Sequence, residues 1–184
     1  MAKYRKKHYK KQKKRNNKIF LNAVMPLLIG YMVYRYLNNV LIGLAIPVTI
    51  WSIPFIMRRR TYHRYMNSTI HAVDNMSGEE FEEYLQAHFK SKGYHVEHVG
   101  QKGDFGADLI LGRGNDKIIV QAKRYSSNVG VAAVQQVISA KEYYGGSHAM
   151  VVTNSHFTSA AKQMADRCAV ELWDRDTLKK VFGD

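Results

Sequence analysis

Residues 103–108 read Gly-Asp-Phe-Gly-Ala-Asp, and residues 118–123 read Ile-Ile-Val-Gln-Ala-Lys, with an apolar run and a Gly-Arg-Gly-Asn-Asp sequence between them. Two short β-prone runs around a Gly/Asn/Asp cluster predict a β-hairpin. Side chains alternate between the two faces of a strand, so Gln121 and Lys123 share a face. Pairing across the hairpin can therefore bring Asp108 within reach of both.

These three side chains would group a carboxylate, an amide and an ammonium at one end of a small sheet. That combination suits a hard divalent cation held through oxygen ligands, with a fixed positive charge beside it. Taken singly, Asp108 is as well explained as a turn residue, and Lys123 as a charge that keeps an edge strand soluble. Because both residues are embedded in otherwise apolar strands, the sequence favours a chemical role.

The net charge of +13 is unevenly distributed along the chain. Residues 1–64 contain 15 of the 28 Lys and Arg residues and no acid, whereas residues 65–184 contain the other 13 and all 15 acids, a net charge of −2. Basic composition by itself therefore does not predict that the folded domain binds nucleic acid. The single cysteine, Cys168, excludes an intramolecular disulfide and a cysteine-based zinc site, and we expect a buried, inert thiol.

The first third of the chain predicts a membrane anchor. Residues 1–18 form a basic tail, and two uncharged runs, 19–34 and 40–57, follow before a cluster of three arginines. A spanning helix needs about 20 apolar residues, so the second run qualifies and the first nearly does. Dense positive charge at both outer ends places both ends in the cytoplasm. We predict a two-helix transmembrane hairpin at 19–57 and a linker at 58–75.

This arrangement predicts a multi-pass protein of the cell (inner, cytoplasmic) membrane, with both termini and the following domain in the cytoplasm. A signal peptide and a re-entrant hairpin are the alternatives, but the basic region is long for a signal peptide and no small-residue cleavage pattern follows it. The basic tail at 1–18 can lie on anionic lipid, each charge near the surface contributing about 1 kcal/mol. It can also bind DNA phosphates nonspecifically. Its position favours lipid.

Residues 76–184 predict a small α/β domain. Ser77 and Glu80 have the spacing of a capping box at the start of a helix that Gly93 ends. The order αβββαβαβα predicts a mixed sheet flanked by helices. The other expected elements are strands at 94–99, 109–111, 118–123, 149–152 and 170–173, helices at 131–144 and 158–168, and a terminal helix capped by Asp176.

Glu82 is the acid of the first domain helix that is best placed to reach a site on the sheet. At about 100° per residue it borders the apolar stripe of that helix, whereas Glu79 and Glu83 point away. His95 and His98 lie three apart on a strand and face opposite sides, so we expect solvated histidines rather than a pair of metal ligands.

Residues 77–182 resemble the Mrr-like restriction endonuclease family of the PD-(D/E)xK nuclease superfamily. The resemblance implies a restriction-endonuclease-like mixed sheet with an αβββαβ core, and residues 1–64 lie outside it. It rests on Gly78 with Phe81-Glu82, Lys92-Gly93-Tyr94, the motif at 103–108, Gln121-Ala122-Lys123-Arg124-Tyr125, Val131-Ala132-Ala133-Val134-Gln135, Val152-Thr153-Asn154 and Phe157-Thr158.

By this resemblance Asp108 and Glu82 would be the metal-binding acids, with the Gln121 side chain and the Ala122 carbonyl near the metal. Lys123 would be the catalytic lysine, and the ion would be Mg²⁺ or Mn²⁺. Gln121 stands where the superfamily pattern has an acid, which leaves fewer anionic ligands and predicts weaker metal binding.

Arg124, Lys102 and Gln135 are candidate contacts to the DNA backbone, although surface solubility explains each of them equally well.

Two functions compete. The first is a membrane-anchored, metal-dependent endonuclease that hydrolyses DNA phosphodiester bonds, for example in the restriction of foreign DNA, as a homodimer if it cuts both strands. The second is a catalytically degenerate nuclease domain that binds DNA or a protein at the membrane. The intact Asp108, Gln121 and Lys123 set favours the first. The chain has no Gly-Lys-Ser/Thr phosphate loop, and a Ser/His hydrolase has only the adjacent Ser155 and His156.

Overall fold

A computed structural model describes residues 21, 24–99 and 105–183 of the chain. The chain divides into two compact units, Met1–Thr61 and Tyr62–Asp184. The predicted basic tail at 1–18 lies outside the described residues.

The first unit contains two apolar helices, α2 (Met25–Leu37) and the larger part of α3 (Val40–Met66). We expected residues 35–39 to connect them, but the connection is shorter, because α2 continues through Arg35. Asn38 adopts a left-handed conformation with φ 48°, which ends α2. The side chain of Asn39 then accepts hydrogen bonds from the amides of Leu41 and Ile42, at 3.1 and 3.4 Å, at the start of α3.

Among the described residues, α3 alone is long and apolar enough to cross a membrane, judged by length and composition, with a mean hydropathy of 2.2 over 18 residues. Two hydroxyl groups in its apolar stretch are satisfied within the helix, since Thr49 Oγ1 donates to the Ile46 carbonyl and Ser52 Oγ to the Thr49 carbonyl, each at 2.8 Å. The described part of α2 has 13 residues, about 20 Å at 1.5 Å per residue. The first predicted span begins at residue 19, in the segment where only residue 21 is described before residue 24, so it stays a prediction.

The second unit has the predicted order of elements. After the short helix α4 (Ile70–Val73) come α5 (Gly78–Ser91), β1 (His95–His98), β2 (Leu109–Arg113), β3 (Asp116–Lys123), α6 (Val131–Tyr144), β4 (His148–Thr153), α7 (Ser159–Arg167), β5 (Val170–Trp173) and α8 (Arg175–Phe182). The capping box is confirmed, because Ser77 Oγ accepts from the Glu80 amide and the Glu80 side chain accepts from the Ser77 amide.

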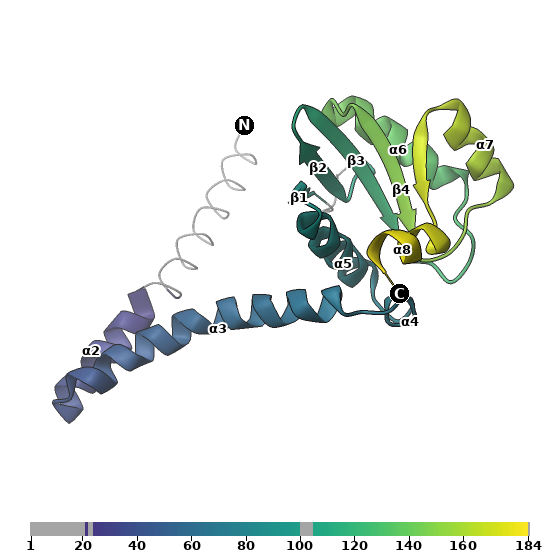
Figure 1. Cartoon of the computed structure of the whole chain (residues 1–184). Helices are drawn as coiled ribbons and strands as arrows, with labels where there is room; N and C mark the ends of the chain where they lie inside the picture. The colour runs from purple at the N-terminus through teal and green to yellow at the C-terminus, as the bar shows by residue number, and fades with distance from the viewer. Residues whose placement is uncertain (1–20, 22–23, 100–104, 184) are drawn as a thin grey trace, which may run out of the picture. The chain divides into compact units, whose positions relative to one another are not determined.

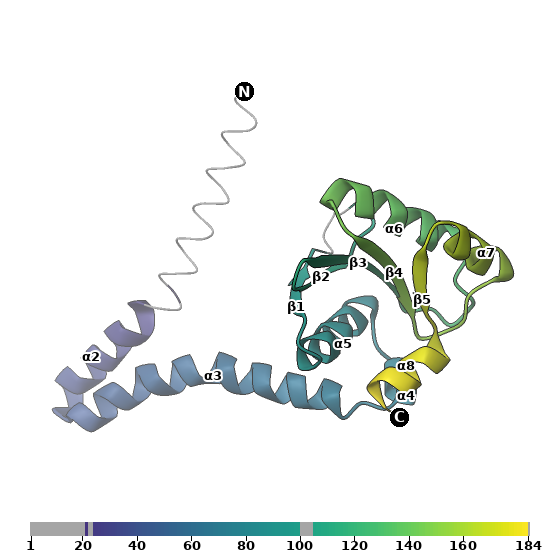
Figure 2. The ribbon, with the colours of Figure 1, turned by 45° about the horizontal axis from the view of Figure 1, so that its top comes forward.

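The five strands form one mixed sheet in the order β1-β2-β3-β4-β5. β1, β2 and β3 are antiparallel neighbours, whereas β3, β4 and β5 run parallel. Helices α6 and α7 cover one face of the sheet, and α5 and α8 lie on the other (Figures 1 and 2). The predicted restriction-endonuclease-like class, a mixed sheet flanked by helices, is confirmed.

Each face of the sheet has its own apolar core. On the α5 side, Phe81, Leu85 and Phe89 are buried against Leu109 and Val120 of the hairpin. On the α6 side, the buried residues include Ile110, Ile119, Val134 and Val137. Odd-numbered positions near the end of β3 therefore face α6, and this alternation directs Gln121 and Lys123 to that side.

The second unit begins earlier than we expected. We assigned 58–75 to a linker and 76–184 to the domain, but Tyr65, Ile70 and Val73 are buried in the core on the α5 side. The hydroxyl group of Tyr65 also donates to Glu83 at 2.8 Å. The part of this segment from Tyr65 to Val73 therefore packs in the second unit, where its apolar side chains join the core beside α5.

Two smaller predictions at the C-terminal end were wrong. Asp174, not Asp176, caps α8, since its Oδ1 accepts hydrogen bonds from the amide and the hydroxyl of Thr177, both at 3.0 Å. Cys168 is exposed rather than buried; it is the residue that follows α7, which ends at Arg167.

Acidification is expected to destabilise the fold through His88. The imidazole is buried, stacks on Phe182 with 4.3 Å between ring centroids, and bonds through Nε2 to the Tyr65 carbonyl at 3.2 Å. Burial lowers the pKa of His88 from its ordinary 6.5. The unfolded chain therefore binds the proton more readily, and the stability that the neutral ring contributes is lost as pH falls below about 6.5. Thermal unfolding of the full chain between pH 7.5 and 5 should show a falling Tm.

His88→Gln is the matched variant for this experiment, because an amide can still donate to the Tyr65 carbonyl but does not titrate in this range. The difference in Tm between the two proteins should narrow as the pH falls. A constant difference across the range would contradict the assignment to His88.

Candidate active site

A cavity of about 560 Å³ lies between the β2–β3 hairpin and α6. It contains three of the side chains predicted for the site, Asp108, Gln121 and Lys123. The rest of its lining is supplied by Phe105, Gly106, Ala132, Gln135, Gln136 and Ser139. The sequence prediction that the hairpin brings the carboxylate, the amide and the ammonium to one place is confirmed for these three residues.

The hairpin register sets the position of Asp108. Leu109 pairs with Val120, so the preceding residue lies opposite Gln121. Asp108 Oδ2 accepts a hydrogen bond from the Ala122 amide at 2.7 Å and another from the Gln121 amide group. Asp108 is 8% exposed and Gln121 2%. A buried carboxylate held by two donors is fixed in orientation.

The side chain of Gln121 has an unsatisfied hydrogen-bond acceptor. Its Oε1 is buried and has no hydrogen-bond partner among the described residues, while its Nε2 is occupied by Asp108 and, at 3.4 Å, by the Ala122 carbonyl. An unpaired buried acceptor costs free energy unless a donor or a cation fills the gap. A carboxylate, an amide oxygen and a backbone carbonyl in one place are ligands of the kind that Mg²⁺ and Mn²⁺ prefer. The residues present therefore fit a divalent cation.

Lys123 is held by its backbone and presents its side chain to the cavity. It pairs with Thr153 of β4, and its carbonyl accepts a hydrogen bond from Thr153 Oγ1 at 2.7 Å. The residue is half-buried, so the ammonium group has access to solvent and to any ligand of the cavity. Its place two residues after Gln121 on one strand keeps the two side chains on one face.

Glu82 is not among the residues that line this cavity. It lies on α5, on the other side of the sheet, where its Oε2 contacts His98 Nε2 at 2.8 Å. The Glu82 side chain is 18% exposed and that of His98 31%. The structure therefore separates Glu82 from the three cavity residues and gives it a histidine partner, and its role as a metal ligand stays a prediction. His98 is not simply solvated, as we had expected.

The three residues predicted to contact DNA have different positions. Gln135 lines the cavity, whereas Lys102 lies outside the described residues. Arg124 lines a separate cavity of about 290 Å³, donates to the Asp74 carbonyl at 3.3 Å, and has a buried Nε without a partner among the described residues. Asp74 is in turn held by Arg175, with two contacts of 2.6 and 2.8 Å that lower the pKa of its carboxyl group.

Comparison with known proteins assigns the family. The family model for the Mrr catalytic domain, described as a restriction endonuclease, matches residues 73–182, more than half of the chain. The chain belongs to the Mrr-type restriction endonuclease family. No curated protein matches it.

Two of the solved structures that match this chain show low similarity to it. One is the crystal structure of a protein of unknown function, AF1548, with 13% identity and a TM-score of 0.45 over 51% of this chain and 56% of that chain. The other is the MspJI restriction endonuclease in complex with a 27-mer oligonucleotide, with 19% identity and a TM-score of 0.37 over 72% of this chain and 30% of that chain. The chain thus spans less than two thirds of either protein.

The wall of the cavity in this Mrr-type domain includes side chains that sequence reasoning missed. Ala132, Gln136 and Ser139 occupy one stripe of α6, at the spacing of successive turns. Gln136 and Ser139 are polar residues among the apolar positions of this helix, which is the signal in the sequence that could have identified these two. Only the fold shows that the stripe faces Asp108.

Gly106 positions the loop of the Mrr-type domain that precedes Asp108. Its φ is +89°, and a Cβ atom there would lie 2.8 Å from Gln136 Cβ and 2.9 Å from the Gln136 carbonyl oxygen. Gly106→Ala should therefore lower the free energy of unfolding by about 1–3 kcal/mol and reduce plasmid cleavage, because strain and a clash with α6 displace the loop. Gly78→Ala is the control, since nothing lies within 4 Å of its added Cβ. Equal stability of the two variants would contradict this role.

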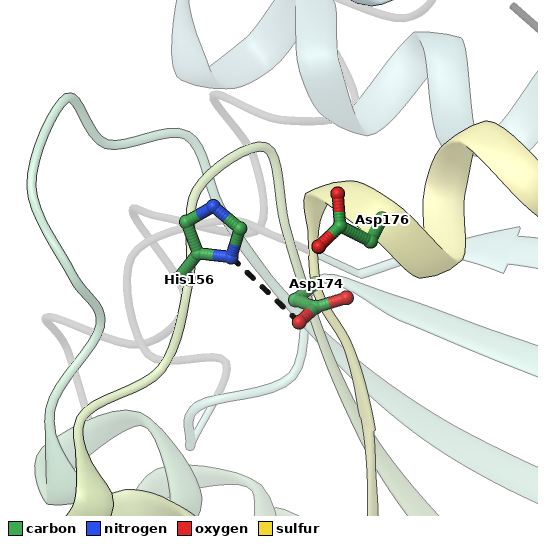
Figure 3. A group of neighbouring side chains, drawn as sticks. All are labelled: His156, Asp174 and Asp176. Carbon is green, nitrogen blue, oxygen red and sulfur yellow. Dashed lines mark ion pairs between the residues drawn. The ribbon is translucent and has the colours of Figure 1, made fainter.

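A second group of potential ligands lies outside the cavity. His156, Asp174 and Asp176 have ligand atoms within 4.8 Å of one another (Figure 3). Asp174 already caps α8 through Oδ1, and its Oδ2 forms an ion pair with His156 Nδ1 at 3.8 Å. These contacts explain the group as a structural feature of the start of α8.

Proposed function

We propose that this protein is a membrane-anchored, divalent-metal-dependent endonuclease that hydrolyses phosphodiester bonds of DNA in the cytoplasm, as in the restriction of foreign DNA. The observation that carries the proposal is that Asp108, Gln121 and Lys123 line the same cavity in a domain of the restriction endonuclease family. Hydrolysis of a phosphodiester needs a positioned water, neutralisation of charge at the phosphate and stabilisation of the leaving oxygen.

Asp108 and Gln121 are the residues that would hold Mg²⁺ or Mn²⁺, with Glu82 and the Ala122 carbonyl as further candidates. Bound there, the cation would supply Lewis-acid polarisation of the phosphate. The hydrogen bond from the Ala122 amide, 2.7 Å, keeps the Asp108 carboxylate oriented. Such an ion would also contact the unpaired Oε1 of Gln121 and so remove the free-energy cost of burying that acceptor.

Lys123 acts through its charge and its donors. A protonated lysine has three N–H groups and no acceptor, so it can hold the oxygen of an attacking water or of the phosphate but cannot remove a proton. Its positive charge opposes the negative charge that develops on the phosphoryl oxygens. Gln135, on the facing helix, is available to donate to a phosphate or a base.

The pairing of Glu82 with His98 favours the second candidate function, a degenerate domain that binds DNA or a protein. In that arrangement the cavity contains one carboxylate, and metal binding would be weak. If Glu82 does take part in catalysis, its carboxylate must reach the cavity from its present place beside His98. The affinity for a divalent metal therefore distinguishes the endonuclease from the binding module, for which weak binding is expected.

The test is cleavage of supercoiled plasmid by the full chain in detergent, with Mg²⁺ or Mn²⁺ and with EDTA. Metal-dependent nicking, together with metal binding at millimolar concentration or below, is expected. Sedimentation of the same protein shows whether it is the homodimer that cutting of both strands would require. A protein that binds DNA but does not bind metal or cleave DNA in any condition would be a binding module instead.

The anchor is supported by the exposed apolar side chains of α3, such as Leu41 and Phe55. An apolar helix of this length is stable in lipid, where its backbone groups bond internally. Membranes from cells that express the protein should retain it after extraction with carbonate at high pH. Release into the supernatant would contradict anchoring by residues 19–57.

A further inference from the structure

Two exposed aromatic rings lie at the edge of the candidate active site. Phe105 lines the cavity, and its ring stacks on Tyr143 with 3.9 Å between centroids and 24° between planes. The two residues remain 56% and 60% exposed. A stacked pair of exposed aromatic rings at the edge of a site of chemistry is apolar surface of the kind that marks contact with a ligand.

The backbone of Phe105 supports this interpretation. Its φ is +54°, a region that bulky residues seldom adopt and that glycine tolerates without cost. Strain of this kind persists where the surrounding structure maintains it, and it concentrates at ligand sites. The next residue, Gly106, packs directly on Gln136 of α6, which fixes the direction in which Phe105 presents its ring.

Tyr143 continues the cavity wall along α6. It lies one turn after Ser139, which lines the cavity together with Gln136. The wall thus begins with side chains that can hydrogen-bond and ends in an aromatic face. The groups of a nucleotide follow the same order, from a charged phosphate through a polar sugar to a flat base.

We propose that Phe105 and Tyr143 form an aromatic platform on which a DNA base next to the cleaved phosphate stacks. This inference rests on the proposed nuclease function and adds to it where the base next to the cleaved phosphate would bind. Stacking on an aromatic side chain requires a base with an open face, as in single-stranded or locally unpaired DNA. The platform therefore favours an unpaired nucleotide over continuous duplex at this position.

The experiment uses the full chain in detergent, with EDTA to prevent cleavage. The probes are a single-stranded oligonucleotide that carries one 2-aminopurine and the duplex of the same sequence. Stacking quenches 2-aminopurine fluorescence, so the readout reports the base itself and not the phosphate contacts of basic residues. Phe105→Gly removes the ring and suits the positive φ, so the variant should fold with an unchanged or higher Tm.

The wild-type protein is expected to quench the single-stranded probe, and Phe105→Gly should lose the quenching and bind that probe at least about fivefold more weakly. Phe105→Tyr should retain both properties. Tyr62→Leu, which removes an exposed ring of α3 far along the chain from the cavity residues, is the control and should behave as wild type. Quenching and affinity that survive in Phe105→Gly would overturn the platform.

Plasmid cleavage measured on the same preparations separates the two proposals. If wild type cleaves the plasmid but Phe105→Gly binds the probe unchanged, the nuclease function stands and the platform fails. If wild type does not cleave with any divalent metal, the proposed function fails first. A change of oligomeric state in Phe105→Gly without a change in quenching would assign the rings to a protein contact and overturn the inference.

Discussion

Lys123→Ala is expected to reduce cleavage of supercoiled plasmid by at least about 100- to 1,000-fold, the loss typical of one electrostatic group aimed at a developing negative charge. The ammonium group of Lys123 provides positive charge in the cavity that also contains Asp108 and Gln121. Its removal leaves Asp108 and Gln121, the proposed metal ligands, in place, so metal binding should change little. Initial rates of nicking, measured with saturating Mn²⁺, give the comparison.

The fold should survive this substitution. Lys123 is half-buried, and the hydrogen bond that holds it to Thr153 uses its backbone carbonyl. Tm is therefore expected to stay within a few degrees of the wild-type value. Lys162→Ala, which removes an exposed lysine of α7, is the matched control and should retain full activity. Cleavage by Lys123→Ala at the wild-type rate would exclude the assigned role.

The sequence predicted the parts of the site that depend on local chain geometry. Gly114 and Asn115 turn the hairpin between Arg113 and Asp116, and the alternation of a strand then fixes which side chains share a face. For this reason the amino-acid sequence alone was enough to group Asp108, Gln121 and Lys123. The order of helices and strands followed from the same kind of signal, since capping and apolar periodicity are local.

Features that depend on distant contacts could not be predicted. Glu82 lies at the correct angle on α5, but its partner His98 becomes visible only when β1 packs beside that helix. Tyr65 reads as part of a polar linker, yet its hydroxyl bonds to Glu83, 18 residues further along the chain. Phe105 and Tyr143 are 38 positions apart, and no periodicity links a loop residue to the last turn of α6.

Gln121→Glu is the second substitution with a large expected effect, because it restores the acid that the superfamily pattern has at this position. In EDTA the new carboxyl group would face Asp108 Oδ2, which now accepts a hydrogen bond from the Gln121 amide. Two buried carboxylates at one place repel each other, so the pKa of the new acid is expected to be raised. The variant should lose roughly 1–3 kcal/mol of unfolding free energy at pH 7 without metal.

The sign of the pH dependence follows from that raised pKa. The folded state would hold a proton that the unfolded chain releases near pH 4.3, so the stability of the variant in EDTA should fall as the pH rises above about 4.3. Divalent metal should reverse the loss, because a cation replaces the proton between the two carboxylates. Tm measured with and without Mn²⁺, at pH 5 and pH 8, tests each part of this expectation.

Metal binding gives the decisive comparison. A second carboxylate raises the charge of the ligand set, and we expect the affinity for Mn²⁺ to rise by about tenfold or more, measured by calorimetry. Gln135→Glu is the matched control, since it adds the same charge to the cavity wall from α6 and not from the strand that carries Gln121. If both variants bind Mn²⁺ equally, the affinity depends on the total charge of the cavity and not on position 121. If only Gln121→Glu gains affinity, Asp108 and position 121 hold the ion between them, and the native amide at position 121 limits the affinity for the metal.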